Sequence, residues 1–289
     1  MKVARTIAAV REAVSTARRG GATIGLVPTM GALHEGHYSL IEAAADACGL
    51  AVVSIFVNPT QFGPGEDYGR YPRTPEADLA GCEARGVGAV FMPPVEEMYR
   101  REPVTTVHVA GLTERLCGRS RPGHFDGVCT VVAKLLAIVG PDAAYFGAKD
   151  YQQASAVRRM VADLSLPVRI EVLPTVRAAD GLALSSRNEL LSDDERAQAP
   201  AIYAALCEGR RRVAAGCRRA GQVAQAVRDR LRSDAPDGRI DYVEIVDPDD
   251  LQDVEEIAGP VVIAAAVRFP SARLIDNIRV DGPADGPVE

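Results

Sequence analysis

Short apolar runs alternate with amphipathic segments along the first 175 residues of the chain. The apolar runs are rich in Val, Ile and Ala and predict buried strands at 24–27, 51–57, 89–92, 143–146 and 168–173. The segments between them carry the apolar spacing of helices at 38–48, 75–85, 127–139 and 151–164. This alternation predicts an α/β fold, a Rossmann-like parallel sheet with helices on both faces.

The pattern changes after Pro174. A polar segment at 177–194 precedes two charged helices at 195–212 and 222–233, and three apolar runs follow at 242–246, 261–269 and 274–280. Helices followed by strands predict a smaller C-terminal α+β domain. We therefore divide the chain into domains 1–175 and 176–289, with 282–289 as a frayed tail.

Composition narrows the class of protein. A net charge of −6 opposes a broad nucleic-acid-binding face. The six cysteines form no CxxC pair, as is usual in a reducing compartment. The N-terminus lacks the apolar run of a signal peptide, and no stretch approaches the roughly 18 apolar residues of a membrane span. The prediction is a cytoplasmic protein with no nucleic-acid or membrane partner.

The first candidate site is His34-Glu35-Gly36-His37, which follows the strand at 24–27 and a turn at 28–31. Unpaired N–H groups and the helix dipole favour phosphate at such a helix start, and imidazoles can donate to its oxygens. Two alternatives stay open on this motif alone, an incidental surface pair and a metal site. Zinc needs three or four protein ligands, and the only other histidines are His108 and His124.

A second strand end repeats this arrangement. Gly147 follows the strand at 143–146, and Lys149, Asp150 and Gln153 come at the start of the next helix. Lys149 offers a charge for phosphate, Asp150 could accept from ribose hydroxyls, and Gln153 could recognise a hydroxyl or carboxylate. The alternative is a helix cap with a surface charge.

Two further segments carry polar side chains suited to a small substrate. Ser185, Ser186 and Arg187 follow the turn signal Asp180-Gly181 and could close over an anion, or form an ordinary ST-turn. The amides of Asn58 and Gln61 follow the strand at 51–57 and suit a polar organic substrate, although Asn-Pro turns are common.

Together these motifs resemble the pantothenate synthetase (pantoate–β-alanine ligase) family. The resemblance runs in order along nearly the whole chain, through Pro28-Thr29-Met30-Gly31-Ala32-Leu33-His34-Glu35-Gly36-His37, Phe56-Val57-Asn58-Pro59-Thr60-Gln61-Phe62, Tyr71-Pro72-Arg73, Phe146-Gly147-Ala148-Lys149-Asp150-Tyr151-Gln152-Gln153, Leu184-Ser185-Ser186-Arg187-Asn188 and Leu274-Ile275-Asp276-Asn277. The HxGH element alone would indicate only the wider nucleotidyltransferase superfamily.

The resemblance implies a two-step reaction. The carboxylate of (R)-pantoate attacks the α-phosphate of ATP and releases pyrophosphate, and the amine of β-alanine then attacks the pantoyl adenylate and releases AMP. The product, pantothenate, is a precursor of coenzyme A. Magnesium is held mainly by the ATP phosphates, with no metal site made by the protein alone, and the family forms homodimers.

The resemblance also implies roles for individual residues. The catalytic set is His34, His37, Lys149 and Asn58. ATP is bound by Met30, His37, Gly147, Lys149, Asp150, Val176, Leu184, Ser185, Ser186 and Arg187, with the adenine at backbone groups of Val176 and Leu184. Pantoate is bound by Met30, Gln61, Tyr71 and Gln153. The 1–175 domain would bind nucleotide and pantoate, and 176–289 would act as a lid.

Some residues match the family without a clear role, and some depart from it. Arg121 and His124 lie in a matching segment, where a substrate role and a structural role are both open. Ala148 and the 268–270 segment differ from the family pattern, so the local geometry is expected to differ there. The competing functions are another HxGH nucleotidyltransferase and a non-catalytic nucleotide-binding module. An aminoacyl-tRNA synthetase would need a tRNA-binding domain and a more basic surface.

Overall fold

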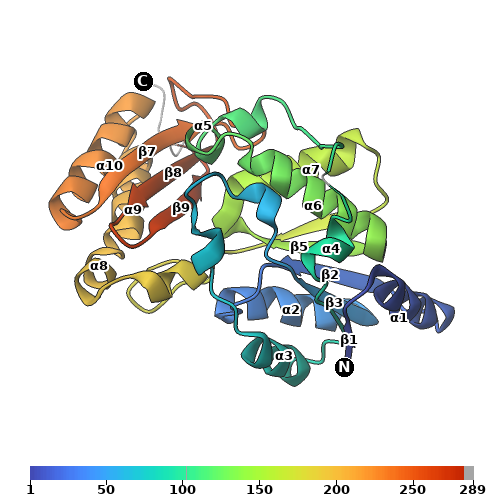
Figure 1. Ribbon diagram of the computed structural model, residues 1–289. Coiled ribbons are helices and arrows are strands. Elements are labelled where there is room, and N and C mark those ends of the chain that lie inside the picture. Colours follow the sequence, from blue (N-terminus) through green and yellow to red (C-terminus); the bar gives the residue numbers. More distant parts are fainter. Residues whose placement is uncertain (102, 283–289) are drawn as a thin grey trace. The chain divides into compact units, whose positions relative to one another are not determined.

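The computed structural model describes residues 1–101 and 103–282, and the chain divides into two compact units (Figure 1). The first unit contains Met1–Glu114, Arg121–Ala148 and Gln153–Thr175. The second contains the chain from Val176 onward together with two short segments, Arg115–Ser120 and Lys149–Gln152. Lys149 and Asp150 therefore belong to the second unit, although the flanking chain belongs to the first.

The first unit is built on a six-stranded sheet in which all paired strands are parallel, in the order β1-β4-β3-β2-β5-β6. The strands are β1 (Lys2–Ala4), β2 (Ile24–Thr29), β3 (Leu50–Ile55), β4 (Ala89–Phe91), β5 (Ala143–Gly147) and β6 (Arg169–Leu173). This confirms the predicted Rossmann-like sheet. Only the three-residue edge strand β1 was not predicted, because its sequence carries no apolar run.

Helices cover both faces of this sheet. The helices α2 (Glu35–Ala47) and α3 (Pro75–Ala84) lie on one face, and α1 (Ile7–Arg19) and α6 (His124–Val139) lie on the other (Figure 1). The unit also carries most of α7 (Tyr151–Asp163) and the short elements α4 (Val95–Met98), η1 (Pro59–Gln61), η2 (Asp67–Arg70) and η3 (Leu112–Glu114), with η4 (Ala148–Asp150) at its boundary. The prediction missed α1, although its apolar residues Ile7, Val10 and Val14 recur at helical spacing.

The order of the strands places the polar motifs of the first unit along one edge. β2 pairs with both β3 and β5. Met30 follows β2, Asn58 follows β3, and Gly147 ends β5, so all three lie at the carboxyl ends of neighbouring strands. In parallel sheets ligands bind at this edge, where the strand order reverses.

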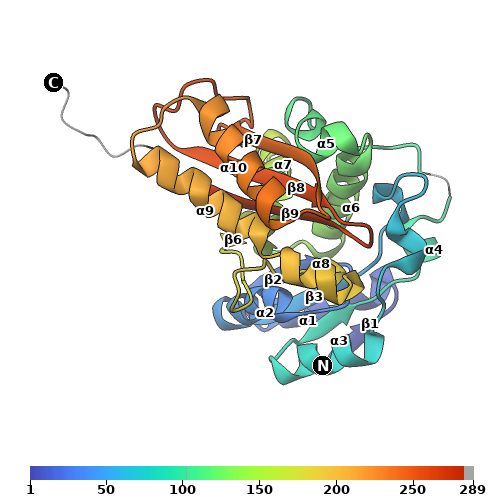
Figure 2. The ribbon, with the colours of Figure 1, turned by 90° about the vertical axis from the view of Figure 1, so that its left-hand side faces the viewer.

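The second unit has a three-stranded antiparallel sheet in the order β7 (Arg239–Val246), β8 (Val261–Arg268), β9 (Arg273–Val280). Helices α9 (Ala201–Ala214) and α10 (Ala220–Asp234) pack on it and on each other (Figure 2). The unit also contains α5 (Cys117–Ser120), η5 (Ser186–Leu190) and α8 (Asp193–Gln198). The predicted α+β arrangement is confirmed.

One predicted helix is wrong as a single element. The segment 195–212 is divided between α8 and α9 at Pro200, because proline has no N–H for the helical ladder and clashes with the preceding turn. The segment 268–270, which differs from the family pattern, comprises the last residue of β8 and the start of the turn to β9, where the Phe269 N–H donates to the Ala272 carbonyl and the Phe269 ring is buried. Of the predicted tail, 283–289 lies outside the described residues.

Between residues 1 and 282, leaving aside residue 102, no helix is both long and apolar enough to cross a membrane.

Candidate functional site

The two histidines of the first motif cap the helix α2. His34 is the N-cap, and its Nδ1 accepts from the Gly36 N–H at 3.1 Å. The His37 Nδ1 accepts from the His34 N–H at 3.4 Å, which completes a capping box. A neutral ring that accepts at Nδ1 carries its proton on Nε2. The Gly36 N–H, one of the helix-start N–H groups expected to bind phosphate, is thus used by the cap.

A buried carboxylate shapes the loop that leads to these histidines. Asp78 on α3 is 2% exposed and accepts from the Ala32 N–H at 3.0 Å, the Leu33 N–H at 2.8 Å and the Thr74 hydroxyl at 3.1 Å. Gly31 has φ 85° and Ala32 φ 49°, both in the left-handed region. Sequence reasoning missed Asp78, and its only signal was a charged residue within a predicted apolar helix face.

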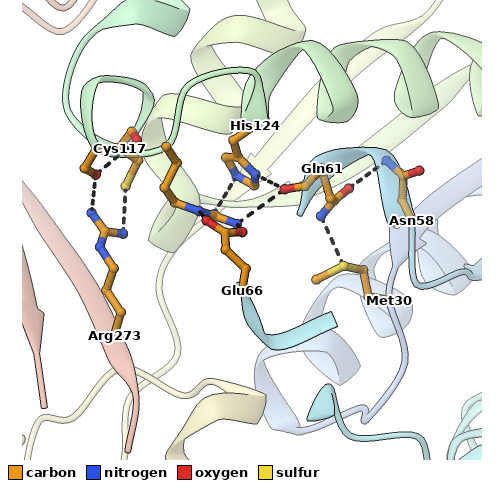
Figure 3. A network of polar contacts seen from close by, with 9 residues as sticks. Met30, Asn58, Gln61, Glu66, Cys117, His124 and Arg273 are labelled. Atoms are coloured by element: carbon orange, nitrogen blue, oxygen red, sulfur yellow. Dashed lines mark hydrogen bonds and ion pairs between the residues drawn. The ribbon is translucent and has the colours of Figure 1, made fainter. Parts of the chain in front are cut away.

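Gln61 is held by its side-chain amide at both ends (Figure 3). Its Oε1 accepts from Asn58 Nδ2 at 3.1 Å, and its Nε2 lies 3.1 Å from the Met30 sulfur. Asn58 is 1% exposed, also donates to the Gly127 carbonyl at 3.1 Å, and accepts from the Tyr99 hydroxyl at 2.8 Å. Burial raises the pKa of Tyr99, which keeps this hydroxyl protonated. Asn58 thus positions Gln61, and its own contact with substrate stays a prediction.

The backbone of Gln61 is held by a second network, formed by Arg121 with His124 and Glu66, of which the last two are labelled in Figure 3. Arg121 donates from Nε to Glu66 Oε1 at 2.7 Å and from Nη2 to the other carboxylate oxygen. Its Nη1 lies 3.0 Å from His124 Nε2, and His124 Nδ1 lies 2.7 Å from the Gln61 carbonyl. Because guanidinium donates to Nε2, the His124 proton is on Nδ1 and is donated to Gln61.

The charge of Arg121 also determines the protonation state of Glu66. Burial raises the pKa of the Glu66 carboxyl, but the hydrogen bond and the charge of Arg121 together outweigh burial and leave the pKa below its ordinary value. Glu66 is therefore ionised at neutral pH and fixes the guanidinium. Of the two roles left open for Arg121 and His124, the structure therefore supports the structural one, which is to hold the Gln61 backbone.

Close backbone packing completes this part of the first unit. A Cβ at Gly127 on α6 would lie 2.4 Å from the Thr60 carbonyl oxygen and 2.7 Å from the Gln61 Cα. Only glycine allows the helix to approach the turn this closely.

The two other predicted pantoate residues of the first unit are at least partly buried. Tyr71 is buried with its ring edge-on to Phe62, at 6.1 Å between centroids. Gln153, on α7, is half-buried.

The second unit carries the predicted lysine. The Lys149 side chain is 19% exposed, its Nζ lies 3.4 Å from Asp150 Oδ1, and its main-chain carbonyl accepts from Asn277 Nδ2 at 2.9 Å. The neighbouring Gln152 is tied to the segment Arg115–Ser120, since its Oε1 accepts from the Cys117 N–H at 3.0 Å. Such low exposure disfavours a solvated surface charge at Lys149.

The loop with the two serines is also ordered within the second unit. The Leu184 N–H donates to the Val176 carbonyl at 3.0 Å, so these two backbone groups are already bonded to each other. Ser185 caps η5 and accepts from the Arg187 N–H at 3.3 Å, which is the ST-turn of the alternative interpretation. Ser186 is buried, and Arg187 is half-buried.

The predicted residues thus form two groups, each inside one unit. The first unit brings Gln61 against Met30 and Asn58, with the capping histidines four and seven residues after Met30. The second unit holds Lys149, Asp150 and the 176–188 loop. All six cysteines are unpaired, and within the described part of the chain no three His, Cys, Asp or Glu side chains are grouped as metal ligands.

Comparison with known proteins gives consistent matches. The model of the pantoate-β-alanine ligase family matches residues 2–279. The pantothenate synthetase of Moorella thermoacetica is 54% identical over 278 residues, covering 96% of this chain and 98% of that protein. The pantothenate synthetase of Geobacillus kaustophilus is 50% identical over 286 residues, covering 99% and 95%.

Solved structures agree with these matches. The chain is similar to a pantothenate synthetase from Thermus thermophilus with a TM-score of 0.90 and 47% identity, covering 96% of this chain and 99% of that one. A pantoate-β-alanine ligase from Francisella tularensis, described as complexed with β-γ ATP and β-alanine, gives a TM-score of 0.77 and 32% identity, covering 96% and 97%.

Proposed function

This chain belongs to the pantoate–β-alanine ligase family and ligates pantoate with β-alanine using ATP, and we propose that the reaction passes through a pantoyl adenylate. The observation that carries this proposal is the contact between Gln61 and Met30, 3.1 Å from Nε2 to sulfur. It puts an amide suited to a hydroxy acid beside the loop that leads to His34 and His37. An acid bound at Gln61 is then close to a triphosphate bound at the histidines.

The chemistry needs no protein nucleophile. A carboxylate oxygen of (R)-pantoate forms a bond to the α-phosphorus of ATP while the bond to pyrophosphate breaks. The amine of β-alanine then attacks the acyl carbon, loses a proton, and releases AMP. Alignment of the reactants and stabilisation of charge on phosphate oxygens supply the catalysis.

We assign the roles as follows. The imidazoles of His34 and His37 and the ammonium of Lys149 stabilise the phosphates, with Ser185, Ser186 and Arg187 as further phosphate contacts. Gln61 and Gln153 bind pantoate beside Met30 and Tyr71, and Asn58 holds Gln61. The ribose meets Asp150 and the backbone of Gly147. The Leu184 N–H already donates to the Val176 carbonyl, so we assign adenine to the other backbone groups of these two residues.

Further proposals concern the setting of the reaction. Mg²⁺ enters with ATP as part of that substrate, held mainly by the phosphates. We propose a homodimer, and a cytoplasmic location supported by the six unpaired cysteines. The second unit would act as a lid through its 176–188 loop, and slower hydrogen exchange of that loop with ATP and pantoate bound is the test.

Exchange of labelled pyrophosphate into ATP tests the function. The proposal expects exchange with pantoate present and β-alanine absent, because the adenylate forms before the amine is needed. Exchange that strictly requires β-alanine would contradict the two-step order. A non-catalytic nucleotide-binding module would bind ATP with no exchange, and another nucleotidyltransferase would keep the nucleotide on its product.

A further inference from the structure

Two consecutive polar residues are buried in the middle of strand β9. Asp276 is 4% exposed and Asn277 is 9% exposed, between Ile275 and Ile278. Burying a carboxylate and an amide costs free energy unless both are fully hydrogen-bonded. Successive residues of a strand point to opposite faces of the sheet, so these two side chains reach different partners.

Asp276 holds the loop that carries the two serines. Its carboxylate accepts from Arg177 Nη1 at 2.6 Å and from Nη2 at 2.9 Å. The same guanidinium donates to the Gly181 carbonyl at 3.1 Å and stacks over the Tyr203 ring at 3.7 Å. Arg177 pairs with Ala183 in a short antiparallel bridge, so fixing Arg177 fixes the chain that enters Ser185.

Asn277 holds the lysine segment. Its Nδ2 donates to the main-chain carbonyl of Lys149 at 2.9 Å, and its own N–H donates to Asp276 Oδ1 at 2.8 Å. The bond is to the backbone, so Asn277 fixes where the Lys149 side chain starts without restricting the ammonium group. One dipeptide of β9 is therefore bonded to both segments of the second unit that offer groups to phosphate.

We propose that Asp276 and Asn277 are positioning residues for the ATP triphosphate, which hold Lys149 and the Ser185–Arg187 segment in fixed register. This inference rests on the proposed function, because it takes both segments as phosphate contacts. Neither residue touches the nucleotide. Their effect is on the affinity for Mg-ATP and on adenylate formation, and the affinity for pantoate is unchanged.

The first experiment compares two isosteric changes by calorimetry with Mg-ATP. Asp276→Asn removes the charged acceptor of Arg177 and should raise the Kd about tenfold or more, the usual effect of losing a hydrogen bond to a charged group. Asp241→Asn is the matched control, since Asp241 pairs with Arg273 at 2.8 Å in the same sheet, and Arg273 in turn donates to Cys117 and Ser120. A purely structural role predicts equal loss of stability and no difference in Kd, and that result overturns the proposal.

The second experiment is a double-mutant cycle on the Mg-ATP Kd. Asn277→Ala should raise the Kd about fivefold in the wild-type background, as expected for one neutral hydrogen bond. It should have little further effect in Lys149→Ala, which keeps the backbone carbonyl but has no ammonium to position. Fully additive effects contradict action through Lys149. Arg279→Ala, at an exposed position of β9, is the control and should change nothing.

The two hypotheses fail in different ways. If Lys149→Ala leaves both the Mg-ATP Kd and pyrophosphate exchange unchanged, the phosphate role of Lys149 is wrong, and the proposed function loses that assignment. If Lys149→Ala weakens ATP but Asp276→Asn and the isosteric Asn277→Asp bind it as the wild type does, the positioning role is wrong. The isosteric variants keep the test open if Asn277→Ala does not fold.

Discussion

Replacing Gly127 with alanine tests whether the turn that carries Gln61 is rigidly packed. The added Cβ would lie 2.4 Å from the Thr60 carbonyl oxygen and 2.7 Å from the Gln61 Cα, where ordinary contacts between heavy atoms are about 3.5 Å or more. Both neighbours are main-chain atoms, so no side chain can rotate away. The turn must therefore move by about 1 Å relative to α6.

Gly127→Ala should lower the free energy of unfolding only slightly but should lower kcat/KM for pantoate strongly. Overpacking costs about 2 kcal/mol, and the better helix propensity of alanine returns about 1 kcal/mol, which leaves a net loss of about 1 kcal/mol. Because Gly127 also accepts from Asn58, the same movement displaces the Gln61 amide. A displacement of about 1 Å at a substrate contact can lower kcat/KM about a hundredfold.

Steady-state kinetics with varied pantoate, calorimetry with Mg-ATP and urea unfolding measure the three quantities. Gly221→Ala is the matched control, because Gly221 also lies in a helix and a Cβ there meets no atom within 4 Å. It should leave the kinetic constants unchanged, and the urea concentration at the midpoint of unfolding should be unchanged or slightly higher. Wild-type kcat/KM for pantoate in folded Gly127→Ala would refute the reasoning, and so would an equal loss of ATP affinity.

Three further substitutions extend the test to each group of residues. Lys149→Ala should lower the rate of adenylate formation about a hundredfold or more in single-turnover assays, as loss of one preorganised charge stabiliser does, without unfolding the protein. Gln61→Ala should raise the KM for pantoate at least tenfold and leave the calorimetric Kd of ATP nearly unchanged, since the amide is assigned to the acid. Glu66→Gln should lower the free energy of unfolding at pH 7 by about 1 kcal/mol, because a partly exposed ion pair with Arg121 is screened by solvent. The pKa of Glu66 is below its ordinary 4.5 in the folded state, so the carboxylate stabilises the protein above pH 4.5, and the difference from wild type should vanish as the pH falls through the folded-state pKa. A difference that persists in acid would show that the loss is one of packing rather than charge.

Elements with strong local patterns could be predicted from the sequence. The strands β2, β3, β5 and β8 are buried on both faces, and their apolar runs are visible without any knowledge of the fold. β1 is three residues long at an edge and has no pattern of its own. In contrast, α1 carries apolar residues at helical spacing, Ile7, Val10 and Val14, and the prediction overlooked them. The division at Pro200 was readable in principle, because proline ends helical pairing wherever it stands.

Within the candidate site, the groups that face a substrate were easier to predict than the groups that hold them. Lys149, Gln61 and the histidines follow strand ends, where polar side chains are conspicuous. Asn58, which holds Gln61, is three residues away and was predicted with it, but other residues that hold these groups bond across long sequence separations. Asp78 accepts from a residue 46 positions away, and Asp276 accepts from one 99 positions away. No local pattern encodes such pairs, because they depend on the completed tertiary structure.

The residues that hold the candidate site segments, such as Asp78 and Asn277, have a physical reason for being carboxylates or amides. A strand end or a helix start leaves backbone groups without partners in the regular ladder, and a buried carboxylate or amide can bond two or three of them at once. Asp78 does this for Ala32 and Leu33, and Asn277 does it for Lys149. An apolar residue of similar volume would be easier to bury, but it would leave those backbone groups unpaired and the loops free to move. Burying these side chains costs free energy, and in return the groups offered to the substrate are held in fixed positions. Substitutions at Asp78, Asp276 or Asn277 should therefore alter the affinity for substrate although these residues do not contact it.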